Sequence, residues 1–110
     1  MTNLERLKMD IKGINFTDAE LEIYLLENNL AATSEYTKQD NLNILKTTLA
    51  ILESVANNPS MMKSYKTDDI TVQDFAENLQ NRIDQLNRKI REIEYKAENS
   101  GASFVYMFSR

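Results

Sequence analysis

The sequence predicts an all-α protein, a small helical bundle with a long C-terminal helix and a short extended apolar tail. The chain has 110 residues, of which 42% are apolar and 27% charged, which is enough for one domain with a modest core. With only 2 Gly and 1 Pro it lacks the turn residues that a β-sandwich or barrel needs. Its apolar residues recur at the three- and four-residue spacing of helices. We therefore expect a helical bundle domain over residues 1–100 and a C-terminal docking tail over residues 101–110.

Two capping boxes mark the starts of the first two helices. Thr2 stands three residues before Glu5, and Thr17 stands three residues before Glu20. At this spacing each side chain satisfies a free backbone amide of the other residue. The first helix is expected to end at Gly13, and the second at an Asn-Asn pair.

The third helix is expected from Asp40 to Asn57, after a loop over residues 30–39. It carries two neighbouring apolar stripes. One stripe consists of Leu42, Leu45, Leu49, Leu52 and Ala56, and the other of Ile44, Thr48, Ile51 and Val55. About half of the helix circumference is thus apolar, so the helix is either central or faces two partners.

The last helix is predicted from Val72 to Glu98, after a polar connector over residues 61–69 that is expected to hold an extended turn. An apolar seam runs along this helix with alternating spacings of four and three. It consists of Val72, Ala76, Leu79, Ile83, Leu86, Ile90, Ile93 and Ala97. Such a seam fits a coiled coil with another chain, but we favour packing against the third helix of the same chain, because three heptads is close to the lower limit for a coiled coil.

Composition excludes most enzyme chemistry. The chain contains no His and no Cys, so it has no imidazole base, no thiolate nucleophile and no Cys/His zinc site. Carboxylate chemistry would need acidic residues that converge in a pocket, which a short helical chain hardly encloses. We therefore expect no enzyme activity, no metal and no cofactor. No apolar run reaches the roughly 20 residues of a membrane span, and no signal peptide is recognised, so we expect a soluble intracellular protein.

The charge distribution offers one candidate contact face. The formal net charge of -4 argues against a simple duplex-DNA binder. A local basic cluster on the last helix remains as a possible contact face for nucleic acid or an acidic partner, namely Arg82, Arg88, Lys89 and Arg91. Because Asp84, Glu92 and Glu94 are interleaved with these residues, we favour a solvated helix face.

The C-terminal tail is the strongest functional candidate in the sequence. It alternates aromatic and aliphatic residues without a charge, in the order Phe104, Val105, Tyr106, Met107 and Phe108. Two interpretations stay open. The tail either fills a groove between the helices of its own subunit, or binds a partner by strand addition or insertion into a pocket. Gly101 as a hinge favours the partner.

Four stretches follow one another in the order of a known family. They are the acidic helix Thr17–Leu25, the hydrophobic helix Leu49–Ala56, the lysine-bearing turn Lys66–Val72 and the helix Phe75–Leu86. Over about residues 15–98 the chain resembles the small head-tail connector, or head completion adaptor, proteins of long-tailed bacteriophages.

The resemblance implies a structural subunit of the virion neck. Copies of the chain would form a ring, commonly of about twelve subunits, under the portal protein. The ring would extend the DNA channel, let DNA pass without sequence-specific binding, and support the stopper or tail-completion protein. The matching role of Phe104–Phe108 is docking on the portal, and Ile44, Ile51 and Val55 would pack between subunits.

An alternative from another class remains open. The chain is then a small coiled-coil regulatory or nucleic-acid-associated protein. Its seam residues Ile83, Leu86 and Ile90 would form the dimer, and the basic cluster of the same helix would bind the partner.

Overall fold

Helices dominate the structure, as the sequence predicts. The computed structural model describes residues 1–67 and 69–100, the last three of them by their backbone alone, so the predicted tail and its residues Phe104–Phe108 lie outside the described residues. The elements in chain order are α1 (Asn3–Asp10), α2 (Asp18–Glu27), the 3-10 turn η1 (Lys38–Asp40), α3 (Asn41–Ala56), the 3-10 turn η2 (Pro59–Met61), α4 (Met62–Tyr65) and α5 (Val72–Ser100). In this described part extended backbone pairs only at two isolated bridges, and no strand forms.

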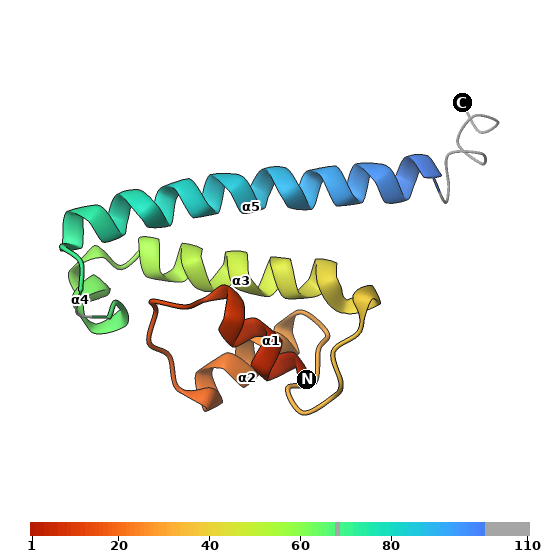
Figure 1. Cartoon of the computed structure of the whole chain (residues 1–110), viewed down its shortest axis with the longest axis horizontal. Coiled ribbons are helices and arrows are strands. Elements are labelled where there is room, and N and C mark those ends of the chain that lie inside the picture. Colours follow the sequence, from red (N-terminus) through yellow and green to blue (C-terminus); the bar gives the residue numbers. More distant parts are fainter. Residues whose placement is uncertain (68, 101–110) are drawn as a thin grey trace.

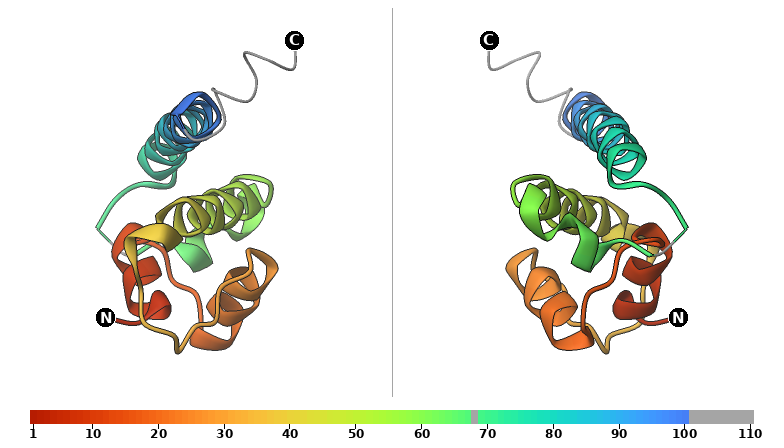
Figure 2. Two further views of the ribbon diagram at one scale, coloured as in Figure 1. Left: turned by 90° about the vertical axis from the view of Figure 1, so that its right-hand side faces the viewer. Right: turned by 90° about the vertical axis from the view of Figure 1, so that its left-hand side faces the viewer.

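The helices form three layers with α3 in the middle (Figure 1). The long helix α5 runs along one side of α3, and the short helices α1 and α2 pack against the other side. Seen end-on, α5 leans toward the side of α1, whereas α2 lies on the opposite side (Figure 2). No described helix is both long enough and apolar enough to cross a membrane.

The two apolar stripes of α3 face two separate cores. Leu45 and Leu52 pack with the seam of α5, in a cluster that also contains Phe75, Leu79 and Ile83. On the other side of α3, Ile44 and Ile51 belong to a cluster with buried residues of α1 and α2, namely Leu7, Ile11, Leu21, Leu25 and Leu30. The prediction of a helix that is central or has two partners is confirmed, and both partners belong to the same chain.

This arrangement corrects the proposed subunit contacts. Ile44, Ile51 and Val55 are 0% exposed within the single chain, two of them under α1 and α2 and the third in the core with α5. These side chains have no surface left for a neighbouring subunit. The stripe is apolar as predicted, but its partners belong to the same chain: α1 and α2 cover Ile44 and Ile51, and Val55 packs in the core with α5.

Both predicted capping boxes form. The amide of Glu5 donates to Thr2 Oγ1 at 3.2 Å while the amide of Thr2 donates to Glu5 Oε1 at 2.8 Å. At the start of α2 the corresponding distances between Thr17 and Glu20 are 3.2 and 2.9 Å. At the start of α1, the amide and the hydroxyl of Thr2 both donate to the Glu5 carboxylate, and they lower its pKa below the ordinary value of 4.5.

The chain leaves the first two helices through residues with left-handed backbone. Gly13, just after α1, has φ 93°, and Asn29, just after α2, has φ 64°. Only Gly adopts this region without strain, and Asn tolerates it better than most residues. Both predicted helix ends are thus confirmed.

The connector over residues 61–69 differs from the prediction. Where an extended turn was expected, Met62–Tyr65 form the one-turn helix α4. The ring of Tyr65 stacks on Phe16 with 4.9 Å between centroids, and the Asn15 amide donates to the Tyr65 carbonyl. This contact with a residue 49 positions away organises the connector, and local sequence carries no sign of it.

The seam of α5 faces α3. Leu79, Ile83, Leu86 and Ile90 are all buried, and Lys46 of α3 pairs with Glu94 at 3.0 Å on the flank of the same contact. The favoured interpretation of the seam as an intrachain contact is confirmed. The central part of the seam, from Leu79 to Ile90, is therefore covered within the chain, whereas Ile93 is partly exposed and Ala97 is exposed.

Candidate functional site

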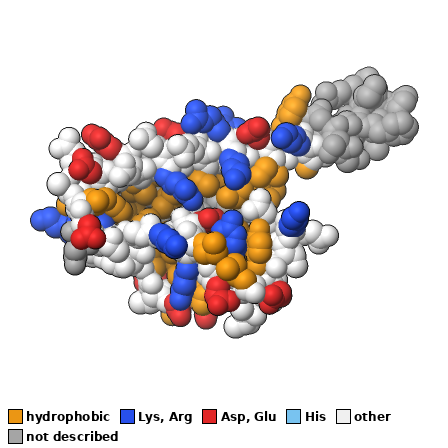
Figure 3. All heavy atoms as spheres, in the orientation of Figure 1, with side chains coloured by type: hydrophobic (Ala, Val, Ile, Leu, Met, Phe, Trp, Pro, Cys, Tyr) orange, Lys and Arg blue, Asp and Glu red, His pale blue; other side chains and the backbone are white. Residues whose placement is uncertain are grey.

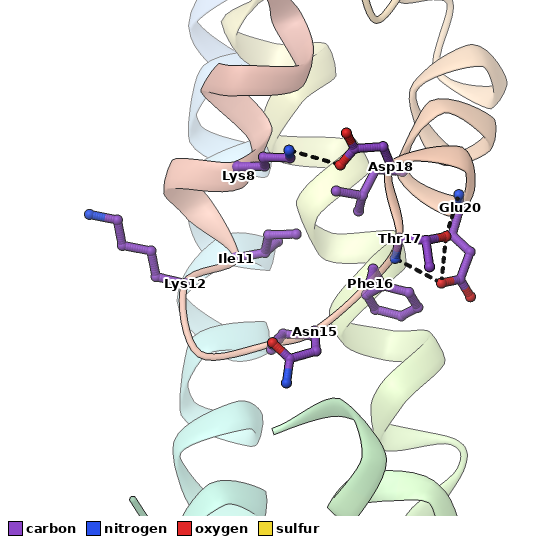
Figure 4. Close-up of a pocket in the computed structure, with 10 residues that line it drawn as sticks. Lys8, Ile11, Lys12, Asn15, Phe16, Thr17, Asp18 and Glu20 are labelled. Atoms are coloured by element: carbon purple, nitrogen blue, oxygen red, sulfur yellow. Dashed lines mark hydrogen bonds and ion pairs between the residues drawn. The ribbon is translucent and has the colours of Figure 1, made fainter. Parts of the chain in front are cut away.

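The hollow between α1 and α2 offers little chemistry. It measures about 420 Å³ and is lined by residues 8–21 (Figure 4). Three of its four charged side chains are already engaged, since Lys8 Nζ pairs with Asp18 Oδ1 at 2.8 Å and Glu20 caps α2, and the fourth is Lys12. Among the described residues, no group of three or more Asp or Glu is placed to hold a metal ion.

A longer groove lies between α1 and α5. We call it the α1–α5 groove and define it by the residues of two adjoining hollows of about 320 and 280 Å³ that share Asp10 and Arg82. Leu45 and Leu52 of α3 form its floor, and Leu79 and Leu86 of α5 form part of one wall. Figure 3 shows apolar side chains in this hollow and Lys and Arg side chains around it.

One polar link crosses the groove. Arg82 Nη2 of α5 donates to the carbonyl oxygen of Asp10 at 3.3 Å and lies 4.0 Å from its carboxylate. The same carboxylate accepts from Arg6 Nη1 at 2.9 Å, which raises the pKa of the Arg6 guanidinium. Asp10 is thus held between two arginines, and the other basic side chains on the groove remain available.

Those available side chains are Lys12 and Lys89, one from each side of the groove. Lys12 follows α1 and extends away from Asp18 and Glu20 (Figure 4). Lys89 lies on α5, seven residues after Arg82 and therefore on the same edge of the helix. Neither lysine makes a side-chain hydrogen bond or ion pair with any described residue. The α1–α5 groove thus combines an apolar floor, a polar link between Asp10 and Arg82 that crosses it, and a basic rim.

The second candidate surface is the outer face of α2. Ile23 is 59% exposed and Leu26 is 72% exposed, and Ala19 lies on the same side of the helix. At 100° per residue, Glu22 flanks this face on one side and Glu27 on the other. We call these five residues the α2 outer face.

The composition of α2 makes this face unusual. Leu21 and Leu25 on its inner side are buried, so the helix is apolar on two opposite sides. It contains no Lys or Arg, and within the described chain the carboxylates of Glu22 and Glu27 have no partner. A helix with apolar residues on both sides normally has a neighbour on both sides. Among the described residues, nothing covers the α2 outer face.

The structure divides the predicted basic cluster. Arg82 and Lys89 lie along the α1–α5 groove, whereas Arg88 and Arg91 point to the side of α5 that turns away from α3. The Arg91 side chain donates to the carbonyl of Asn87 on its own helix. The four residues therefore do not form one contact face.

Sequence reasoning missed both candidate surfaces. The stretch Thr17–Leu25 was described only as an acidic helix, although Ile23 and Leu26 stand beside its carboxylates. The signal for the face was present, since Leu21, Ile23, Leu25 and Leu26 cannot all lie on one side of a helix. The groove had no such signal, because it forms between segments that are far apart in the sequence.

Comparison of the chain with protein-family models, with curated proteins and with solved structures finds no match to any of them. What supports a function is therefore the geometry of the two surfaces, together with the pattern in the sequence.

Proposed function

We propose that this chain is a structural subunit that assembles with copies of itself into a ring, as the head-tail connector of a long-tailed bacteriophage. In this role the ring lies under the portal, extends the DNA channel and supports attachment of the stopper or tail. The single observation that carries the proposal is the exposed apolar face of α2.

An exposed apolar face is costly unless a partner covers it. Complete burial of an Ile or Leu side chain contributes about 1.5–3 kcal/mol, and Ile23 and Leu26 are the two most exposed aliphatic side chains in the core-forming helices α1 to α3. Neither Ile23 nor Leu26 belongs to either of the two hydrophobic cores. An uncovered apolar face of this kind on an otherwise well-packed domain is typical of a protein interface.

The nature of the surfaces favours a structural role. One surface is acidic and apolar and the other is basic and apolar, so two copies of the chain offer each other complementary surfaces. The net charge of -4 also suits a channel through which DNA passes without sticking. The order of sequence features resembles that of the connector family, and Phe104–Phe108 remain the proposed portal-docking segment.

Reconstitution with a portal tests this proposal. The purified chain and the portal protein of the same phage are mixed, and complexes are analysed by native mass spectrometry and electron microscopy. We expect rings of the chain on the portal face that receives the tail. Deletion of residues 102–110 is expected to abolish portal binding while the circular dichroism spectrum stays helical. A truncated chain that binds the portal as well as the intact one would remove the tail from the proposal.

The alternative of a dimeric coiled-coil regulator has less support. It needs Ile83, Leu86 and Ile90 at a dimer interface, and these side chains are buried against α3 of their own chain. Sedimentation separates the two functions. A dimer that persists at all concentrations and ignores the portal favours the regulator and contradicts the connector.

A further inference from the structure

We propose that the α2 outer face of one copy docks into the α1–α5 groove of the next copy. This contact is the interface between neighbouring subunits of the proposed ring, so the inference rests on the proposed function. It is a helix-in-groove contact, in which an amphipathic helix lays its apolar side into an apolar channel.

The apolar parts of the two surfaces match in form. Ile23 and Leu26 are one helical turn apart and project from the same side of α2. In the groove, Leu45 and Leu52 of the floor are already buried, and the exposed aliphatic side chain among the lining residues is Ile70, at 39%. Docking would cover the exposed aliphatic groups of both copies at once.

The charges match in sign and in placement. Glu22 and Glu27 stand on opposite flanks of the docking helix, about 140° apart around its axis. Lys12 and Lys89 stand on opposite sides of the groove. A helix that lies in the groove therefore presents one carboxylate to each side, and all four groups are without partners in the described chain.

The positions of the two surfaces exclude contact within one chain. The groove lies between α1 and α5, with its apolar side chains visible in Figure 3. Seen end-on, α5 leans toward the side of α1, and α2 lies on the opposite side (Figure 2). A contact between two different surfaces is heterologous, so each added copy leaves a free α2 face at one end and a free groove at the other. Such a contact gives a ring when the rotation between successive copies closes and an open helical filament when it does not.

A second copy suits the groove better than the chain's own tail. The side chains of residues 101–110 include no carboxylate, so they offer no anionic side chain to the basic rim. The α2 outer face supplies both the apolar residues and the carboxylates. We therefore commit to a second copy as the occupant.

Charge reversal tests the contact. The variant E22K/E27K reverses the charge of the α2 outer face, and K12E/K89E reverses the charge on the rim of the groove. The chain with all four changes exchanges the signs of the two surfaces. Self-association of each protein is measured by sedimentation velocity over a range of concentrations and salt, and helicity by circular dichroism. We expect each double variant to associate at least about tenfold more weakly than the wild type and the fourfold variant to recover association.

Matched controls carry the same charge changes elsewhere. E53K/E77K alters two exposed carboxylates of α3 and α5, and R88E/R91E alters the outward edge of α5. Both are expected to associate like the wild type. The docking is overturned if the controls weaken association as much as the surface variants, or if the fourfold variant fails to recover it.

Cross-linking identifies the occupant directly. Because the chain has no cysteine, a short bismaleimide added to a mixture of L26C and I70C proteins reacts only at these two positions, and mixed pairs are compared with the like pairs formed by each protein alone. We expect cross-linked pairs of different copies. If deletion of residues 102–110 strengthens association and no mixed pair forms, the tail occupies the groove and the docking is wrong.

Failure of the function and failure of the docking give different results. A wild-type chain that self-associates through the two surfaces but ignores the portal contradicts the connector role and leaves the docking supported. A ring on the portal that is unaffected by either double variant contradicts the docking and leaves the connector role supported. A wild-type chain that is monomeric at every concentration, with and without the portal, contradicts both.

Discussion

The helices α2 and α5 bury their apolar residues in different ways. The seam of α5 occupies one side of the helix, and α3 covers its buried residues from Phe75 to Ile90. In α2 the inner residue Leu25 is 0% exposed while its neighbour Leu26 is 72% exposed. An apolar side chain thus contributes to folding in one place and remains available for association in the other. The difference lies in the neighbouring helix, not in the residue type.

Substitution of Leu25 by Ala gives the largest expected effect. Leu25 of α2 is fully buried in the core that α2 forms with α1 and α3, and removing most of its side chain leaves a cavity. A loss of about 3 kcal/mol in the free energy of unfolding is expected, as for other buried Leu side chains. Chemical denaturation checks it. A loss below about 1 kcal/mol would mean that α2 does not pack as described.

Phe16→Ala comes next, because Phe16 touches both cores. Its ring stacks on Tyr65 and meets Tyr24 edge to face at 5.9 Å between centroids. It is half-buried, so we expect a loss of about 2 kcal/mol, somewhat below that of a fully buried aromatic residue. The loss should come with faster hydrogen exchange in α4. Unchanged exchange there would contradict the stacking as the cause of the connector's helix.

Thr17→Ala removes the cap of α2. The Thr17 side chain accepts from the amide of Glu20, and without it this amide has no partner at the helix start. A loss of about 1 kcal/mol is expected, and Thr17→Ser should restore most of it. Thermal unfolding monitored by circular dichroism measures both. Equal losses for Ala and Ser would rule out capping as the cause.

Leu26→Ala sharpens the comparison with Leu25. Because Leu26 is exposed in the single chain, its truncation should change the stability of the monomer by no more than about 0.5 kcal/mol. Self-association should weaken all the same. Denaturation at low concentration and sedimentation at high concentration separate the two effects, and a large loss of monomer stability would place Leu26 in a contact within the chain.

The smallest effect concerns the pH dependence of α1. The pKa of Glu5 is lowered by its hydrogen bonds with Thr2, so Glu5 stabilises the fold above its ordinary value of 4.5. This contribution is lost as the pH falls through the lowered pKa. Glu5→Gln should therefore show a flatter decline of stability below about pH 4.5 than the wild type. Parallel declines in the two proteins would contradict a role of Glu5 in the acid sensitivity.

Local signals predicted the helices well, and contacts between distant segments were harder to predict. The capping boxes at Thr2 and Thr17 were recognised because each depends on residues three positions apart. The helix Met62–Tyr65 was missed because it depends on Phe16, which only the folded chain brings near. The same limit applies to the groove, whose sides come from residues about 70 positions apart.

The side chains of Ile44, Ile51 and Val55 illustrate the difference between what the sequence determines and what the tertiary structure determines. The sequence alone determined that this is an all-helical chain, where its main helices start and end, and that α3 has two apolar sides. Only the tertiary structure decided that α1 and α2 cover the second side and that Ile23 and Leu26 remain uncovered. The physical reason is that periodicity depends on neighbouring residues, whereas burial depends on which distant surface a side chain meets.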